Sequence, residues 1–240
     1  MKKMLILLLF PICFYGFSQE IKIPDNFVEA SIPKLYSGDW DSLNHSKDIY
    51  LGKQNKEELI IEKKGKGERS ELEIEGGKLI GIDEGEWGGA LYFRTKNLQE
   101  KLIVIQPGNT VDILKFKNKI YFIQGLSHMG ISDGALYELK RIKNKFTCIK
   151  VTDFDDAPAA ITSFQNKILI ISHKNFYEIN TEESNKVTKI FENQFWESLY
   201  PNSIVAFDER NIFVGMRSGI LKVNIIDKTI NFYRKNIKNE

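Results

Sequence analysis

The stretch Lys119–Leu139, KIYFIQGLSHMGISDGALYEL, holds an apolar segment, a glycine-rich polar loop and a second segment that ends in the tetrad Leu-Tyr-Glu-Leu. A related stretch, KILIISHKNFYEI, begins at Lys167, and its tetrad Phe-Tyr-Glu-Ile starts at residue 176, which is 40 positions after residue 136. Short apolar and β-branched runs bounded by turn residues indicate β-strands. The chain is therefore predicted to repeat one strand-loop-strand unit.

The same pattern continues on both sides of this stretch. Four units of four short β-rich segments follow one another between about residues 68 and 236, and none has a sustained helical period. Equivalent second segments begin at Lys78, Lys119, Lys167 and Asn211, at spacings of 41, 48 and 44 residues. A period in the forties with four strands per repeat is typical of β-propeller blades, because packing sheet against sheet buries both apolar faces of each sheet.

The units resemble blades of the β-propeller superfamily, of the NHL-like and YncE-like kind, and this general resemblance implies a fold but no activity. We expect an all-β protein: a β-propeller of five four-stranded blades. In this prediction residues 19–67 form an N-terminal segment or degenerate blade, and residues 68–240 form the other blades. Four blades with an N-terminal extension are the alternative, and a β-sandwich is the competing architecture. Within the N-terminal segment, Ile49–Leu51 and Leu59–Ile61 are predicted to form a hairpin.

The first residues are typical of a secretory signal peptide. Lys2 and Lys3 precede the apolar run Met4–Phe17, and polar sequence begins after Ser18. This run is shorter than the roughly 20 residues that span a bilayer. We expect residues 1–18 to be cleaved and the mature chain to be exported to the periplasm or the cell exterior, with no membrane span after cleavage. A retained membrane anchor is the alternative.

Composition excludes some partners. The 34 basic and 32 acidic residues give a net charge of +2, which offers no clustered positive charge for a nucleic acid. Once Cys13 has left with the signal peptide, Cys148 is the only cysteine, so no intrachain disulfide is expected. We expect a monomer without a cofactor.

Unusual loop residues gather at one set of loops. In a four-stranded blade, the loop between the second and third strands and the loop to the next blade open on the same face, and loops on a rigid scaffold tend to carry binding residues. That face is predicted to hold the ligand-binding candidates, which are Glu84, Trp87, His128, His173, Trp196, Tyr200 and Arg217.

The repeat alignment places three of these candidates at equivalent positions. The residue after the second strand is Glu84, Gly125, His173 and Arg217 in successive units. Equivalent positions converge on the axis of a ring, so a carboxylate, an imidazole and a guanidinium are predicted to share one mouth. The alternative is an ion-pair network that closes a central channel.

Metal and nucleophile motifs are weak. His128 and His173 lack the close spacing of metal ligands, and Asp153, Asp155 and Asp156 lack the order of a calcium loop. No catalytic motif is recognisable around Ser127. We therefore expect no metal site.

Three functions remain open. The first is a binding module for a small molecule, a glycan or a protein. The second is a hydrolase or lyase acting on a carbohydrate or lactone, with Glu84 or His173 as general base and Arg217 as stabiliser of developing negative charge. The third is a structural scaffold of the cell envelope, which predicts a large exposed apolar patch.

Overall fold

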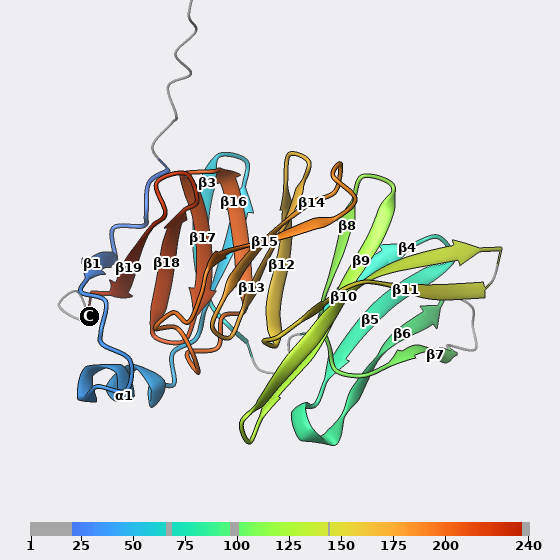
Figure 1. Cartoon of the computed structure of the whole chain (residues 1–240), viewed down its shortest axis with the longest axis horizontal. Helices are drawn as coiled ribbons and strands as arrows, with labels where there is room; N and C mark the ends of the chain where they lie inside the picture. Colours follow the sequence, from blue (N-terminus) through green and yellow to red (C-terminus); the bar gives the residue numbers. More distant parts are fainter. Residues whose placement is uncertain (1–20, 66–68, 97–100, 144, 237–240) are drawn as a thin grey trace, which may run out of the picture.

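The computed structural model describes residues 21–65, 69–96, 101–143 and 145–236 (Figure 1). It is an all-β structure with 63% strand, and its strands form five small antiparallel sheets. The predicted signal peptide, residues 1–18, lies outside the described residues. Within the described residues, no helix is long and apolar enough to cross a membrane.

We number the sheets I to V in chain order. Sheet I consists of β2 (Tyr50–Asn55) and β3 (Glu58–Lys63). Sheet II consists of β4 (Ser70–Ile74), β5 (Gly77–Asp83), β6 (Gly89–Thr95) and β7 (Leu102–Pro107), with the short 3-10 helix η1 (Gly85–Trp87) between β5 and β6. Sheet III consists of β8 (Thr110–Phe116), β9 (Lys119–His128), β10 (Ile131–Ile142) and β11 (Lys145–Phe154). Sheet IV consists of β12 (Pro158–Phe164), β13 (Lys167–Ser172), β14 (Phe176–Asn180) and β15 (Lys186–Phe191). Sheet V consists of β16 (Ser203–Asp208), β17 (Asn211–Met216), β18 (Gly219–Asn224), β19 (Thr229–Lys235) and β1 (Phe27–Ala30).

Alternate residues of the second strands enter different cores. In β13, Ile168 and Ile170 belong to the core between sheets III and IV, whereas Leu169 and Ile171 belong to the core between sheets IV and V. Successive side chains of a strand point to opposite faces of the sheet. A continuous apolar run such as KILIIS therefore needs a neighbouring sheet on each side.

The sheets adjoin in the order II, III, IV, V, I. The first strand of each sheet contacts the first strand of the next along the series β4, β8, β12, β16 and β2, and Figure 1 shows sheets II, III, IV and V standing side by side. Four apolar clusters of described residues fill the four junctions in this series. Sheet I, the first in the chain, thus packs against sheet V, the last.

Sheets I and II, which are consecutive in the chain, differ from these four neighbouring pairs. The outer face of sheet II carries Lys78, whose ammonium lies 2.7 Å from Glu71 and 3.2 Å from Glu73. On sheet I, Lys53 pairs with Glu62 at 2.6 Å. Among the described residues, no apolar cluster joins these two sheets. Charged faces of this kind favour solvent over burial.

One carboxylate links the first strands of three sheets. Asp112 in β8 accepts hydrogen bonds from the hydroxyl of Ser70 in β4 at 2.7 Å and from the backbone N–H of Ile161 in β12 at 3.2 Å. Burial raises the pKa of Asp112, while these hydrogen bonds act in the opposite direction. Asp112 therefore ties sheets II, III and IV together at their first strands.

The predicted strands of residues 68–240 are confirmed, and so is the hairpin within residues 19–67. Five uniform four-stranded blades are not observed, because sheet I has two strands and sheet V has five. The extra strand of sheet V is β1, which pairs with β19 and was not recognised in the sequence. The helix α1 (Gly38–Asn44) was also missed. Ser37 caps its N-terminus, and Trp40 and Leu43 bury its inner face.

The pairing of β1 with β19 makes the N-terminal segment part of the core. Phe27 is 7% exposed and packs edge-to-face on Tyr50, with ring centroids 5.1 Å apart. We expect Phe27→Ala to lower the free energy of unfolding by about 3 kcal/mol, because it removes a buried aromatic ring from the junction of sheets I and V. Urea denaturation measures this change.

The control is Val28→Ala on the same strand, where the side chain is 44% exposed. This variant should stay within about 0.5 kcal/mol of the wild type. Equal effects of the two substitutions would show that β1 is not anchored through Phe27.

Candidate ligand-binding cavity

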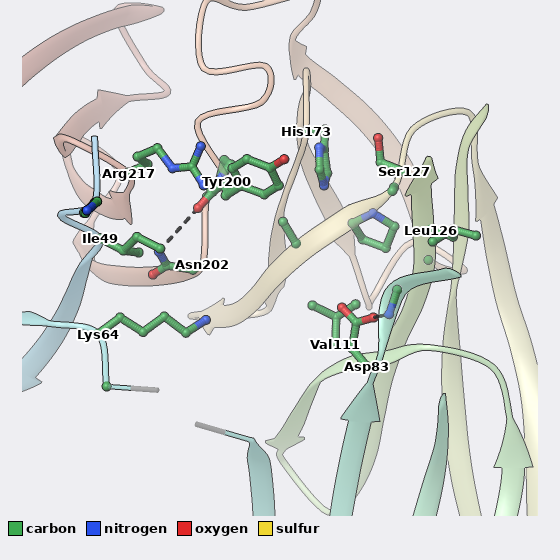
Figure 2. Close-up of a pocket in the computed structure, with 18 residues that line it drawn as sticks. Ile49, Lys64, Asp83, Val111, Leu126, Ser127, His173, Tyr200, Asn202 and Arg217 are labelled. Carbon is green, nitrogen blue, oxygen red and sulfur yellow. Dashed lines mark hydrogen bonds between the residues drawn. The ribbon is translucent and has the colours of Figure 1, made fainter. Parts of the chain in front are cut away.

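A cavity of about 700 Å³ opens at one end of the sheets (Figure 2). Its walls come from sheets II, III and IV, from the loops that leave them, and from the segments that flank sheets I and V. Its lining includes Lys47, Ile49, Lys64, Asp83, Val111, Leu126, Ser127, Pro158, His173, Tyr200, Asn202 and Arg217. The cavity is thus lined by polar, charged and apolar side chains.

Arg217 is held by contacts from three segments. Its backbone N–H donates to the carbonyl of Leu199 at 2.7 Å, and its backbone forms an antiparallel bridge with Ile49. Its guanidinium donates to the backbone carbonyl of Asn44, at the end of α1, and to the Oδ1 atom of Asn44 at 3.0 Å. The helix that the sequence did not reveal therefore positions this arginine.

Tyr200 lies between Arg217 and His173. The guanidinium carbon of Arg217 is 4.4 Å from the centroid of the Tyr200 ring, and the His173 ring meets the same tyrosine edge-on at 5.9 Å. A cation over an aromatic face is attracted by the ring quadrupole. Tyr200 remains 47% exposed, so one part of the ring is free to contact a ligand.

His173 is half-buried in the cavity wall, and its backbone N–H donates to the carbonyl of Ala157 at 3.1 Å. Burial lowers the pKa of His173, and the nearby carboxylates of Asp156, Glu197 and Asp83 offset part of this effect. In the described part of the chain, neither ring nitrogen of His173 has a hydrogen-bond partner. The imidazole is therefore favoured in its neutral form and is not oriented by a carboxylate.

A buried carboxylate fixes the loop that carries His173. Asp156 is 1% exposed and accepts hydrogen bonds from the hydroxyls of Ser132 at 2.6 Å and Ser172 at 2.5 Å, and from the backbone N–H of Lys174 at 2.6 Å. Buried carboxylates persist where several donors compensate for lost hydration. Asp156 thus joins sheets III and IV at the cavity rim.

Two lysines and one aspartate complete the charged wall. Lys47 precedes sheet I in the chain and Lys64 follows it, and both side chains are exposed. Figure 2 shows Lys64 reaching into the cavity, with Asp83 on the opposite wall. Asp83 accepts a hydrogen bond from the backbone N–H of Gly85 at 2.9 Å. A smaller hollow of about 320 Å³ adjoins this wall and is lined by Glu84 and Arg69.

The structure brings three of the seven predicted site residues together: His173, Tyr200 and Arg217. Trp196 is 0% exposed, and its indole N–H donates to the carbonyl of Ser172 at 3.1 Å. Its assignment to the ligand site is wrong, because the ring fills the core between sheets IV and V. Glu84 lines the smaller hollow instead of the cavity.

The two remaining candidates lie on protruding loops outside the cavity lining. Trp87 is 83% exposed in η1, and His128 near the tip of the β9–β10 hairpin lies 3.0 Å from the carboxylate of Glu86. The histidine and the glutamate thus connect the two loops. Among the described residues, no group of three or more His, Cys, Asp or Glu side chains is arranged to hold a metal ion.

Nine of the twelve lining residues named above were missing from the predicted site, among them Lys47, Ile49, Lys64 and Asn202. The first three lie in the N-terminal segment, where no repeat pattern could align them with the other units. Lys64 could have been found from its position directly after a predicted strand, because the predicted site was built from loop residues at the ends of strands. Asn202 lies two residues after Tyr200 and shares its loop.

Comparison with known proteins assigns the chain to no family. No protein-family model matches the chain, and no curated protein matches it. Among solved structures, the chain is similar to the computationally designed Ika8 protein, with a TM-score of 0.36 and 9% sequence identity over 77% of this chain and 73% of that chain. A similarity of this size supports no conclusion about fold or function.

The lowered pKa of His173 makes stability depend on pH. A histidine with a depressed folded pKa contributes stability above its unfolded pKa of about 6.5, and this contribution is lost as pH falls through the folded pKa. We expect the difference in unfolding free energy between wild type and His173→Gln to change by about 1.4 kcal/mol for each unit of pKa depression, as pH is lowered from about 7.5 to 5. The wild type should lose stability relative to the variant. Urea denaturation at each pH measures this.

His45→Gln is the control, since His45 is exposed outside the cavity. A difference between wild type and His173→Gln that stays constant over this pH range would contradict the burial of a neutral imidazole.

Proposed function

We propose that the chain is a five-bladed β-propeller with one blade reduced to two strands. Two observations support this. The sheets adjoin through their first strands, and the first sheet in the chain packs against the last, as closure of a ring requires. In this proposal the charged junction between sheets I and II is a solvated seam.

We propose further that the protein is an exported binding module that holds a small ligand in the cavity. The observation that carries the proposal is that side chains from sheets II, III and IV and from the segments flanking sheets I and V line one cavity, where Tyr200 contacts both Arg217 and His173. A volume of about 700 Å³ falls within the range of about 300–1,000 Å³ that is usual for ligand pockets. The signal-like N-terminal sequence supports export.

The positions and hydrogen bonding of the candidate general bases favour a binding function over catalysis. A general base must reach the proton that it removes and is normally held by a third group. The ring of His173 has no orienting hydrogen bond among the described residues, and Glu84 lines the neighbouring hollow. Tyr200 and Arg217, by contrast, form a preassembled contact surface.

The test is thermal stabilisation by a panel of monosaccharides, amino acids, organic acids and dipeptides. A ligand at 100 times its Kd adds about 2.7 kcal/mol, which raises the Tm of a protein of this size by roughly 5–10 °C. We expect at least one class to stabilise the wild type. Ser127→Trp should remove this effect, because the exposed Ser127 lines the cavity and an indole at this position fills part of it.

Thr188→Trp is the matched control, because Thr188 is exposed on the outer strand β15 and does not line the cavity. It should retain the stabilisation. Failure of every compound to stabilise the wild type, or equal stabilisation of Ser127→Trp, would contradict the proposal.

A further inference from the structure

We propose that the ligand of this cavity is a small organic anion, with a carboxylate or phosphate group that faces Arg217, Lys64 and Lys47. The inference rests on the proposed binding function and names the chemical class of ligand. It follows from the charges that the cavity gathers, from an unpaired hydrogen-bond donor of Arg217 and from the apolar surface of the cavity.

The cationic side chains of the cavity lack carboxylate partners. Lys47, Lys64 and Arg217 make no ion pair within the described residues; burial raises the pKa of Asp112, and the charge of Lys64 offsets only a small part of this effect. Asp83 supplies the one carboxylate among the described lining residues. Three cations thus face one anion.

Lysines on neighbouring strands, by contrast, form ion pairs with carboxylates. Lys53 pairs with Glu62 at 2.6 Å, and Lys63 pairs with Asp48 at 2.9 Å. Lys78 lies 2.7 Å from Glu71. Lys63 and Lys64 are consecutive, yet the first has its own carboxylate and the second lines the cavity. Lysines without an ion pair, such as Lys115, also occur elsewhere on the described surface, but at the opening Lys47 and Lys64 share one cavity with Arg217.

The wall next to Arg217 also contains unpaired polar atoms. The Nε–H donor of Arg217 is buried and has no hydrogen-bond partner in the described part of the chain; the Oδ1 atom of Asn202 is also unpartnered, but as an acceptor it requires a donor and not an anion. A buried donor without a partner costs free energy, which a bound acceptor can recover. An anion is the acceptor that a guanidinium binds most strongly, since its N–H donors match the geometry of carboxylate and phosphate oxygens.

The remaining wall suits the body of an organic ligand. Val111, Leu126 and Pro158 line the cavity with Tyr200, which is 47% exposed, and Figure 2 shows Val111 and Leu126 on the side away from Arg217. A bare inorganic ion would leave these apolar surfaces uncovered. A ligand with its anionic group toward Arg217 and a ring or sugar body against Tyr200 would cover both.

Isothermal titration of the full mature chain with paired probes tests this inference. Benzoate and glucuronate are compared with the uncharged benzamide and methyl glucoside, and glucose 6-phosphate is the phosphate arm. We expect at least one anionic probe to bind and its uncharged counterpart to bind at least tenfold more weakly. Affinity should fall with added NaCl, because the lysines are exposed to screening. The arm that binds more tightly assigns carboxylate or phosphate as the anionic group.

Two variants remove the proposed contacts. Lys47→Gln with Lys64→Gln should weaken binding of the anion by roughly tenfold or more, and Arg217→Met by about 10–100-fold. The lysine variant keeps the inference testable should Arg217→Met fail to fold, because both lysines are exposed. Lys115→Gln with Lys145→Gln removes the same charge from exposed lysines outside the cavity and should leave affinity unchanged.

The inference fails if no anionic probe binds the wild type, if uncharged probes bind as tightly as anions, or if both lysine variants behave alike. The Ser127→Trp variant distinguishes these outcomes from failure of the proposed function, because it reports whether a bound compound occupies the cavity. Uncharged ligands that bind the wild type but not Ser127→Trp would leave the cavity as the site and overturn only its anionic preference.

Discussion

The alternation of core residues along the second strands constrains the whole molecule. Phe122 of β9 enters the core shared with sheet II, whereas Tyr121 and Ile123 enter the core shared with sheet IV. In β17, Phe213 faces sheet I and Val214 faces sheet IV. A strand that is apolar on both faces cannot be satisfied by one neighbouring sheet, so each inner sheet lies between two others. The four filled junctions follow from this requirement.

The same constraint explains why the polar chemistry collects at the ends of the strands. Sheet faces that are occupied by core residues leave few positions for functional groups, so Arg217 and His173 lie immediately after second strands and Asp83 is the last residue of one. The packed sheets hold the backbones of these residues in place. The exception is the face of sheet II away from sheet III, where charged residues such as Lys78 occupy the face itself. Lys64 follows directly after sheet I and lines the cavity.

Sequence periodicity was sufficient for the strands and for part of the site. The equivalent positions of His173 and Arg217 after second strands were visible because both follow continuous apolar runs. Trp196 was misplaced, since a tryptophan in a polar loop gives no sign of whether its ring turns inward. The helix α1 was missed because seven residues with two buried side chains are too short for a helical period, and β1 because its partner β19 lies at the other end of the chain. Contacts between distant segments are not encoded in local pattern.

The competing interpretation of the converging charges was a structural ion-pair network, and the contacts of Arg217 bear on it directly. Such a network needs a carboxylate beside the guanidinium, whereas Arg217 donates to the carbonyl and side-chain amide of Asn44 and lies against Tyr200. These neutral partners hold the guanidinium in place without neutralising it. A cation that is fixed by the core, stacked on a half-exposed ring and left with its full charge is preorganised for an anion from solution. Structural ion pairing would have used that charge within the fold.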